Sequence, residues 1–149
     1  MDQQPVPADA ERWQCYLRVL EARSADTSPG RLSVLAADEI RPIRLWTARN
    51  PNTPPEALRR LAHDEDSTVR WQTLFNPATP PHALEAMAQH EAAEAHPDTF
   101  AVRHLVLHHP NTDPALREQL ARVGACSNRT WYSSLPCPGF RPYRRQMPT

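Results

Sequence analysis

The sequence contains no lysine. All 17 basic residues are arginines, and 17 acidic residues balance them to a net charge of zero. This balance argues against a general binder of nucleic acids or of anionic membranes, because both need an excess of positive charge. Apolar runs are only a few residues long, so no segment of the sequence is expected to span a membrane.

Cysteine and glycine are also scarce. The three cysteines, Cys15, Cys126 and Cys137, form no CxxC motif, which favours free thiols in a reducing cytoplasm over a disulfide framework. The three glycines are isolated, so the sequence has no glycine-rich phosphate loop, and no GxSxG or cysteine-nucleophile signature is present. We therefore expect a cytoplasmic protein that is not an enzyme and has no cofactor.

Proline, by contrast, is abundant, and its 17 copies recur at fixed spacing. Asn-Pro-Asn-Thr-Pro-Pro at 50–55 returns as Asn-Pro-Ala-Thr-Pro-Pro at 76–81 and as His-Pro-Asn-Thr-Asp-Pro at 109–114. The spacings are 26 and 33 residues, and a fainter copy starts at Thr27, 26 residues before Thr53. The sequence therefore contains an internal repeat. Its third copy has seven extra residues, which lie within 92–99.

Each repeat predicts two short helices. Thr53 is expected to cap the first helix, with Pro54 at its first position and Glu56 completing a capping box. Leu58 and Leu61 follow at helical spacing and form an apolar stripe.

The second helix of the repeat is expected over 68–75. Asp66 or Ser67 would cap its start, and Asn76-Pro77 would end it. Helices of two turns are unstable alone in water, so each must bury its apolar stripe against the next repeat, as in a solenoid.

The pattern Asn-Pro-x-Thr-Pro-x-x-x-Leu-x-x-Leu-Ala-x-Asp-x-x-x-x-Val-Arg resembles the leucine-rich repeat variant family, a relative of the HEAT and armadillo α-solenoids. The resemblance covers about residues 24–121. It implies an all-α superhelix of short helical pairs, right-handed and without β-sheet. One branch of that family carries an iron–sulfur cluster in a cysteine-rich segment before its repeats. Only Cys15 precedes the repeats here, so no cluster is expected.

The repeat divides the chain into segments. In chain order they are a loose N-terminus (1–8), a cap helix (9–23), three repeats (24–49, 50–75 and 76–108), a half-repeat (109–121) and an irregular, basic, proline-rich tail (122–149). In the cap helix, four residues form an i, i+3, i+4, i+7 stripe that is expected to seal the first repeat: Trp13, Tyr16, Leu17 and Leu20. The tail is open to three interpretations, namely an irregular cap, a disordered segment or a peptide that orders on a partner.

Three arginines recur at one position of the second helices: Arg44, Arg70 and Arg103. Asp38 and Asp64 lie six residues before the first two. The arginines are expected to bond these aspartates or turn carbonyls of the adjacent repeat, which would lock neighbouring repeats in register. The alternative is a positive stripe that receives an acidic peptide or phosphates.

The positions after these arginines vary between repeats and form three i, i+4 pairs: Leu45 and Arg49, Trp71 and Phe75, and His104 and His108. Because exposed Trp and Arg are enriched among the anchors of interfaces, we expect these pairs to bind a protein or peptide, with the three arginines as polar neighbours. The alternative is that Trp71 packs between repeats. No oligomer is indicated by the sequence, and a monomer is favoured.

Two other functions compete with this hypothesis. His104 and His108 have the spacing of a metal-binding pair, with His109, or His90 and His96, as further ligands. The tail could also bind nucleic acid, through phosphate contacts from Arg129, Arg141, Arg144 and Arg145 and stacking by Trp131, Tyr132 or Tyr143. Because zinc needs three or four convergent ligands and the rest of the chain has mixed charge, we expect neither metal nor nucleic acid.

Overall fold

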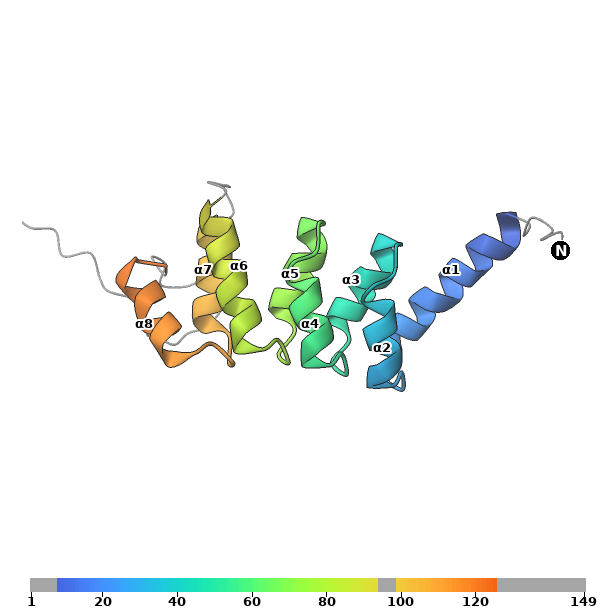
Figure 1. Ribbon diagram of the computed structural model, residues 1–149, viewed down its shortest axis with the longest axis horizontal. Coiled ribbons are helices and arrows are strands. Elements are labelled where there is room, and N and C mark those ends of the chain that lie inside the picture. Colours follow the sequence, from blue (N-terminus) through green and yellow to red (C-terminus); the bar gives the residue numbers. More distant parts are fainter. Residues whose placement is uncertain (1–7, 94–98, 126–149) are drawn as a thin grey trace, which may run out of the picture. The chain divides into compact units, whose positions relative to one another are not determined.

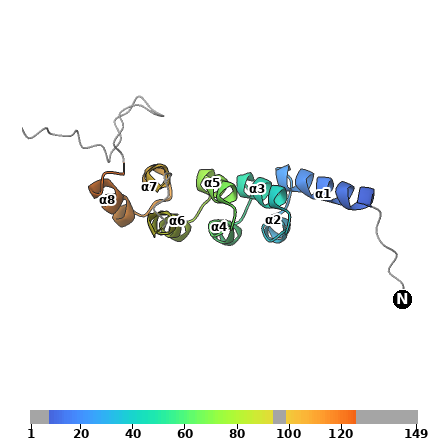
Figure 2. The same cartoon turned by 90° about the horizontal axis from the view of Figure 1, so that it is seen from above.

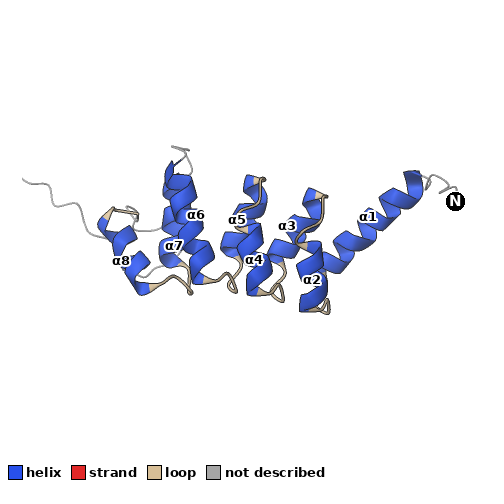
Figure 3. Cartoon of the chain, in the orientation of Figure 1, coloured by secondary structure: helices blue, strands red, loops and turns tan. Residues whose placement is uncertain are grey.

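The computed structural model describes residues 8–93 and 99–125, and all regular structure in these ranges is helical (Figure 3). The helices are α1 (Ala8–Arg23), α2 (Pro29–Leu35), α3 (Arg41–Arg49), α4 (Pro55–Leu61), α5 (Ser67–Phe75), α6 (Pro81–Ala93), α7 (Thr99–His108) and α8 (Pro114–Arg122) (Figure 1). No strand occurs in the described ranges, which confirms the predicted all-α repeat fold. Most of the expected N-terminal segment (1–8) and most of the tail (122–149) lie outside them.

Contacts between residues divide the chain into two compact units, Met1–Ala83 and Leu84–Thr149. In the first unit, α2 with α3 and α4 with α5 form the two helical pairs that the period predicts. Figure 2 shows the first helices of these pairs in one layer and the second helices, together with α1, in the other. In the third repeat α6 has 13 residues where α2 and α4 have 7, so part of the insertion lengthens this helix.

The apolar core of the first unit runs between successive helical pairs. One cluster joins Ala22 of α1, Leu32 and Leu35 of α2, and Ile43 of α3. The next cluster joins Ala48 of α3 to Leu61 of α4 and Val69 of α5. Each pair thus depends on its neighbour for burial, which is the property that defines a solenoid.

The predicted cap at Thr53 is wrong. The N-cap of α4 is Pro54, without a side-chain cap bond, while Thr53 is only 2% exposed and donates its hydroxyl to the carbonyl of Thr47 at 2.6 Å. This carbonyl lies in the last turn of α3, where carbonyls lack the usual bond from the amide four residues later, and it also accepts a hydrogen bond from the amide of Asn50 at 3.1 Å. The hydroxyls at the same repeat position all donate to the carbonyl six residues earlier, namely those of Thr27, Thr79 and Thr112. These threonines therefore satisfy the end of the preceding helix.

The ends of α5 follow the sequence prediction. Asp66 is the N-cap, and its carboxylate accepts hydrogen bonds from the amides of Thr68 and Val69. The helix ends at Phe75, with Asn76 at the C-cap position before Pro77. The residue before a proline disfavours the α-helical conformation, which accounts for this end.

The predicted role of the apolar stripe on α1 is also wrong. Trp13, Tyr16, Leu17 and Leu20 are 61%, 50%, 44% and 39% exposed, so they do not seal the first repeat. The helix packs on α3 through its opposite side, where Ala22 is fully buried and Cys15 and Val19 are half-buried. The stripe is spaced as predicted, but the tertiary packing uses the other face.

Candidate interaction surface

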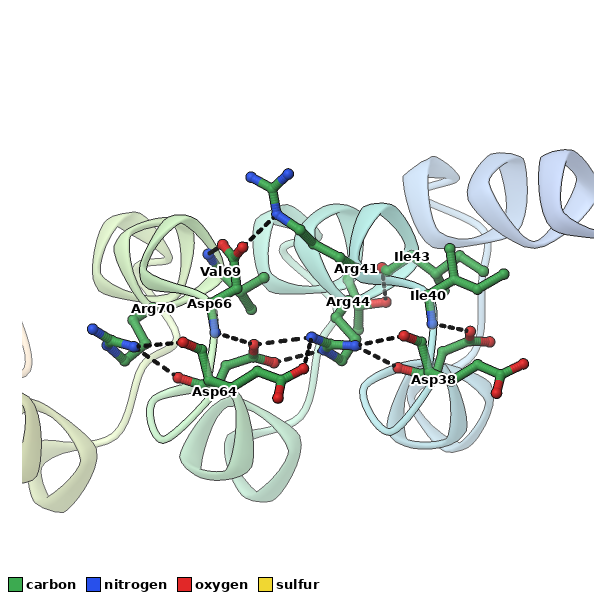
Figure 4. Close-up of polar contacts among 12 residues, drawn as sticks. Asp38, Ile40, Arg41, Ile43, Arg44, Asp64, Asp66, Val69 and Arg70 are labelled. Atoms are coloured by element: carbon green, nitrogen blue, oxygen red, sulfur yellow. Dashed lines mark hydrogen bonds and ion pairs between the residues drawn. The ribbon is translucent and has the colours of Figure 1, made fainter.

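Arg44 on α3 connects two successive repeats. Its Nε and Nη2 donate to the two carboxylate oxygens of Asp64, at 2.7 and 3.2 Å, and its Nη1 donates to the carbonyls of Asp38 and Glu39 at 3.0 Å (Figure 4). The guanidinium thus holds the turn of its own repeat and the turn of the next one. The hydrogen bond that Arg44 donates to Asp64 raises the pKa of Arg44 above its ordinary value, opposed by burial and aided by the charge of that carboxylate.

Arg18 on α1 occupies the same position one period earlier. It donates to Asp38 at 2.6 Å, and the two residues are 20 apart in sequence, as are Arg44 and Asp64. Arg18 was not among the predicted residues, although its offset of 26 from Arg44 identifies it. The second half of α1 therefore matches the second helices of the repeats in its sequence position and in this bond.

Asparagines add a second connection between repeats. The Nδ2 atom of Asn50 donates to the carbonyls of Ala22 and Ser24 at 2.9 and 2.8 Å, and that of Asn76 donates to the carbonyls of Ala48 and Asn50 at 2.8 and 2.9 Å. Each buried amide therefore ties the end of one second helix to the end of the preceding one. Such bonds satisfy carbonyls that burial would otherwise leave unpaired.

The two other arginines of the series lie on α5 and α7. Arg70 is half-buried, and its Nη1 donates to the carbonyls of Asp64 and Glu65 at 2.9 and 3.2 Å, as Arg44 does in its own repeat. Arg103 is half-buried on α7 in the second unit. Arg44 thus bonds the adjacent repeat, as the first of the two alternatives predicts, whereas these bonds of Arg70 are to turn carbonyls of its own repeat.

Arg41 makes a further tie between α3 and α5. Its Nε lies 2.6 Å from the carboxylate of Asp66, the N-cap of α5. Burial would raise the pKa of Asp66, but the hydrogen bonds from Arg41 and from the amides of Val69 and Thr68 outweigh it and lower this pKa below its ordinary value. The second helices of the first unit are therefore held together by charged groups at their N-terminal ends.

The side of α5 that faces away from these bonds carries two aromatic rings. Val69, Thr73 and Leu74 are buried, whereas Trp71 is half-buried and Phe75 is 58% exposed. The rings of Trp71 and Phe75 are stacked, with their centroids 5.9 Å apart. An exposed phenylalanine supported by a tryptophan is typical of a surface that binds another molecule.

On α3 the corresponding side is built around Trp46, which the sequence analysis did not select. The guanidinium carbons of Arg23 and Arg49 lie 4.5 and 4.6 Å from the centroid of its ring, and both arginines are exposed. Leu45, the predicted partner of Arg49, is half-buried and packs against the core cluster of Ala48 and Leu61. Two exposed arginines, one from α1 and one from α3, therefore lie over the half-buried ring of Trp46.

His104 and His108 lie on α7 in the second unit, with ring centroids 4.7 Å apart. Partial burial, His104 and Arg117 lower the pKa of His108 below its ordinary value. Within residues 8–93 and 99–125, no group of three or more His, Cys, Asp or Glu side chains is placed to hold a metal ion. The two rings alone do not supply the three or four ligands of a zinc site. His96, which the sequence offered as a further ligand, lies outside the described residues.

His109 replaces the asparagine of the other repeats and keeps part of its function. Its Nδ1 atom accepts a hydrogen bond from the amide of Asn111 at 3.1 Å, as Oδ1 of Asn50 does from the amide of Asn52. Its backbone carbonyl also accepts from Arg117 at 3.0 Å. His109 thus lies directly after the end of α7 and takes the place of the asparagine there.

The residues of the nucleic-acid alternative, Arg129, Trp131, Tyr132, Arg141, Tyr143, Arg144 and Arg145, all lie outside the described residues. In the part of the chain that the structure describes, no helix has both the length and the apolar character needed to cross a bilayer.

Comparison with curated proteins gave no match, and comparison with solved structures gave none either. Comparison with protein families matched residues 42–66 to the family described as leucine rich repeat variant. The matched segment runs through α3 and α4 to the N-cap of α5 and so spans about one period of the repeat. Over residues 42–66 the chain is therefore similar to the leucine rich repeat variant family, and the residues that the structure describes form an all-helical repeat of α-solenoid type.

Proposed function

We propose that the chain is a non-catalytic scaffold that binds a protein or peptide through the outer side of its second helices. The observation that carries this proposal is the stacked pair of Trp71 and Phe75, in which Phe75 leaves more than half of its surface exposed. Aromatic anchors of this kind supply most of the binding energy in protein interfaces.

The construction of the repeat supports the same function. The buried side of the second helices is used by the core and by the bonds of Arg44, whereas Arg49, Trp71 and Phe75 take no part in the buried core. A repeat scaffold typically binds by offering a few variable side chains from each rigid unit. In this proposal Leu45 packs beneath the surface, and Arg44 and Arg70 hold or border it. Arg103, His104 and His108 occupy the equivalent sequence positions on α7, in the second unit.

The test uses the full chain immobilised as bait in three versions: wild type, the double variant Trp71→Ala with Phe75→Ala, and the control Arg59→Ala. Arg59 is exposed on α4 and pairs with Glu56, away from the second helices. Captured proteins are quantified by mass spectrometry, and thermal melting establishes that all three versions are folded. For each partner that wild type and control retain, we expect the captured amount to fall at least about tenfold on the double variant. Equal retention by all three would reject the proposal.

A further inference from the structure

We propose that the exposed apolar face of α1 is a docking site for an amphipathic helix of another protein, one that carries the leucine pattern of this chain's own first helices. The inference does not depend on the surface of Trp71 and Phe75. It rests on a comparison of α1 with the second helices one and two periods later.

One side of α1 has the same surroundings as its counterpart on α3. Ala22 and Ala48 are both fully buried, and Arg18 and Arg44 both bond the aspartate 20 residues later. This side of α1 packs on α3 just as α3 packs on α5. On this side, α1 therefore makes the same contacts with the following repeat as α3 does.

The other side of α1 lacks the neighbour that its counterparts have. Leu17 corresponds to Ile43 and, one period further, to Val69. Ile43 and Val69 are 0% exposed, because each lies in a core cluster with residues of a first helix, whereas Leu17 is 44% exposed. Leu20 corresponds to Trp46, which also packs against the cluster of Leu32 and Leu35.

The chain provides no first helix for this place among the residues that are described. The period would put it at 3–9, but α1 begins at Ala8 and runs for 16 residues, where α3 and α5 have 9. Figures 1 and 2 both show the N-terminal half of α1 extending past α2 and α3, with no other helix of this unit beside it. Trp13 lies on this half and Tyr16 directly after it, and both enlarge the apolar face.

The chemistry of the missing neighbour can be read from the helices that fill the equivalent places. The α2 helix offers Leu32, Leu35 and the following Ala36, and α4 offers Leu58, Leu61 and Ala62, all of them buried. The occupant that fits α1 is therefore a helix with two leucines three residues apart, followed by an alanine. Its docking would continue an interface that the chain already forms between α2 and α3.

The chain's own α8 is a poorer occupant, although it is also a first helix and no second helix follows it among the described residues. The position of Leu32 and Leu58 is taken in α8 by Arg117, whose guanidinium donates to the carbonyls of His109 and Thr112 at 3.0 and 3.4 Å. A helix with a charged group at the central apolar position would leave that charge against Leu17. We therefore assign the site to a helix of another protein.

The test attaches a copy of residues 53–66, which contain α4, to the N-terminus of the full chain through a flexible linker. The linker raises the effective concentration of a helix that would not form alone. The matched control carries serine in place of the two leucines of the attached copy. Amide hydrogen exchange in α1 is the readout, and we expect about tenfold slower exchange with the leucine copy than with the serine copy. Equal exchange in the two would overturn the proposal.

Two further measurements define the occupant. Leu17→Glu in the chain should abolish the slowing, while Val34→Glu, at a valine that is 60% exposed on α2, should not. Circular dichroism establishes that both variants are helical. Sedimentation of the unmodified chain should show a monomer, and a dimer that Leu17→Glu dissociates would overturn the proposal in favour of a second copy on this face.

Discussion

Arg44 donates two hydrogen bonds to the carboxylate of Asp64, which lies 20 residues later in the next repeat. Both side chains are largely buried, with 10% and 6% of their surfaces exposed. The same guanidinium bonds two carbonyls of its own repeat, so one side chain fixes the positions of two successive turns. Arginine suits this role because its planar group offers several donors in fixed directions. Arg18 and Asp38 repeat the relationship one period earlier.

A substitution at Leu61 tests whether the apolar core lies between successive repeats. It is 1% exposed in the cluster that joins Ala48 to Val69, so Leu61→Ala should lower the free energy of unfolding by about 2–4 kcal/mol through the cavity it leaves. Urea denaturation followed by circular dichroism measures the change. Val34→Ala, at an exposed position, should change it by no more than about 0.5 kcal/mol. Equal effects of the two substitutions would show that the core lies elsewhere.

Substitutions at Thr53 test how much the hydrogen bond between its hydroxyl and the carbonyl of Thr47 contributes to stability. Thr53→Val keeps the shape of the side chain but removes one of the two hydrogen bonds that the Thr47 carbonyl accepts, the other coming from the amide of Asn50, which should cost about 0.5–1.5 kcal/mol of stability. Thr53→Ser retains the hydroxyl and should cost clearly less. Thermal and urea unfolding of the three proteins compare these values. If valine were tolerated as well as serine, the hydroxyl would have no structural role.

The lowered pKa of His108 predicts that the stability of the protein depends on pH. This pKa lies below the ordinary value of 6.5, so the folded protein favours the neutral ring. Its contribution to stability is therefore complete above about pH 6.5 and is lost as the pH falls below that value toward the folded pKa. NMR titration of the imidazole protons should show this lowered pKa.

His104→Ala provides the control for that titration. The charge of His104 is one cause of the lowered pKa of His108, after partial burial, so its removal should raise the pKa toward the ordinary value. Arg117, the third cause, remains in place. An unchanged pKa in the variant would contradict the interaction between the two rings.

Much of the fold was predictable because the same helix-forming sequence pattern occurs in each repeat. Helix ends at Asp66 and Asn76 follow from short-range chemistry and were predicted correctly. Thr53 was misassigned because a threonine before a proline can cap the helix that follows or satisfy the helix that precedes it. Only the position of the preceding helix, whose last turn brings the carbonyl of Thr47 within reach of the Thr53 hydroxyl, decides between the two.

The candidate surface was less predictable. The i, i+4 spacing placed Trp71 and Phe75 on one side of α5, and the structure stacks their rings. Trp46 was missed because its two arginines come from different helices, so only the packing of α1 on α3 brings Arg23 to the ring. The apolar stripe of α1 is visible in the sequence, but whether a neighbour covers it is a tertiary property.

The most direct test of the repeat architecture is a double-mutant cycle on Arg44→Ala and Asp64→Ala. Each substitution removes one partner of a buried charged pair and should lower the free energy of unfolding by about 2–5 kcal/mol. If the two side chains connect successive repeats as the structure shows, the two losses should not add. The loss of unfolding free energy in the double variant should then be smaller than the sum of the two single losses by at least about 1 kcal/mol. Strictly additive losses would contradict the connection between the repeats.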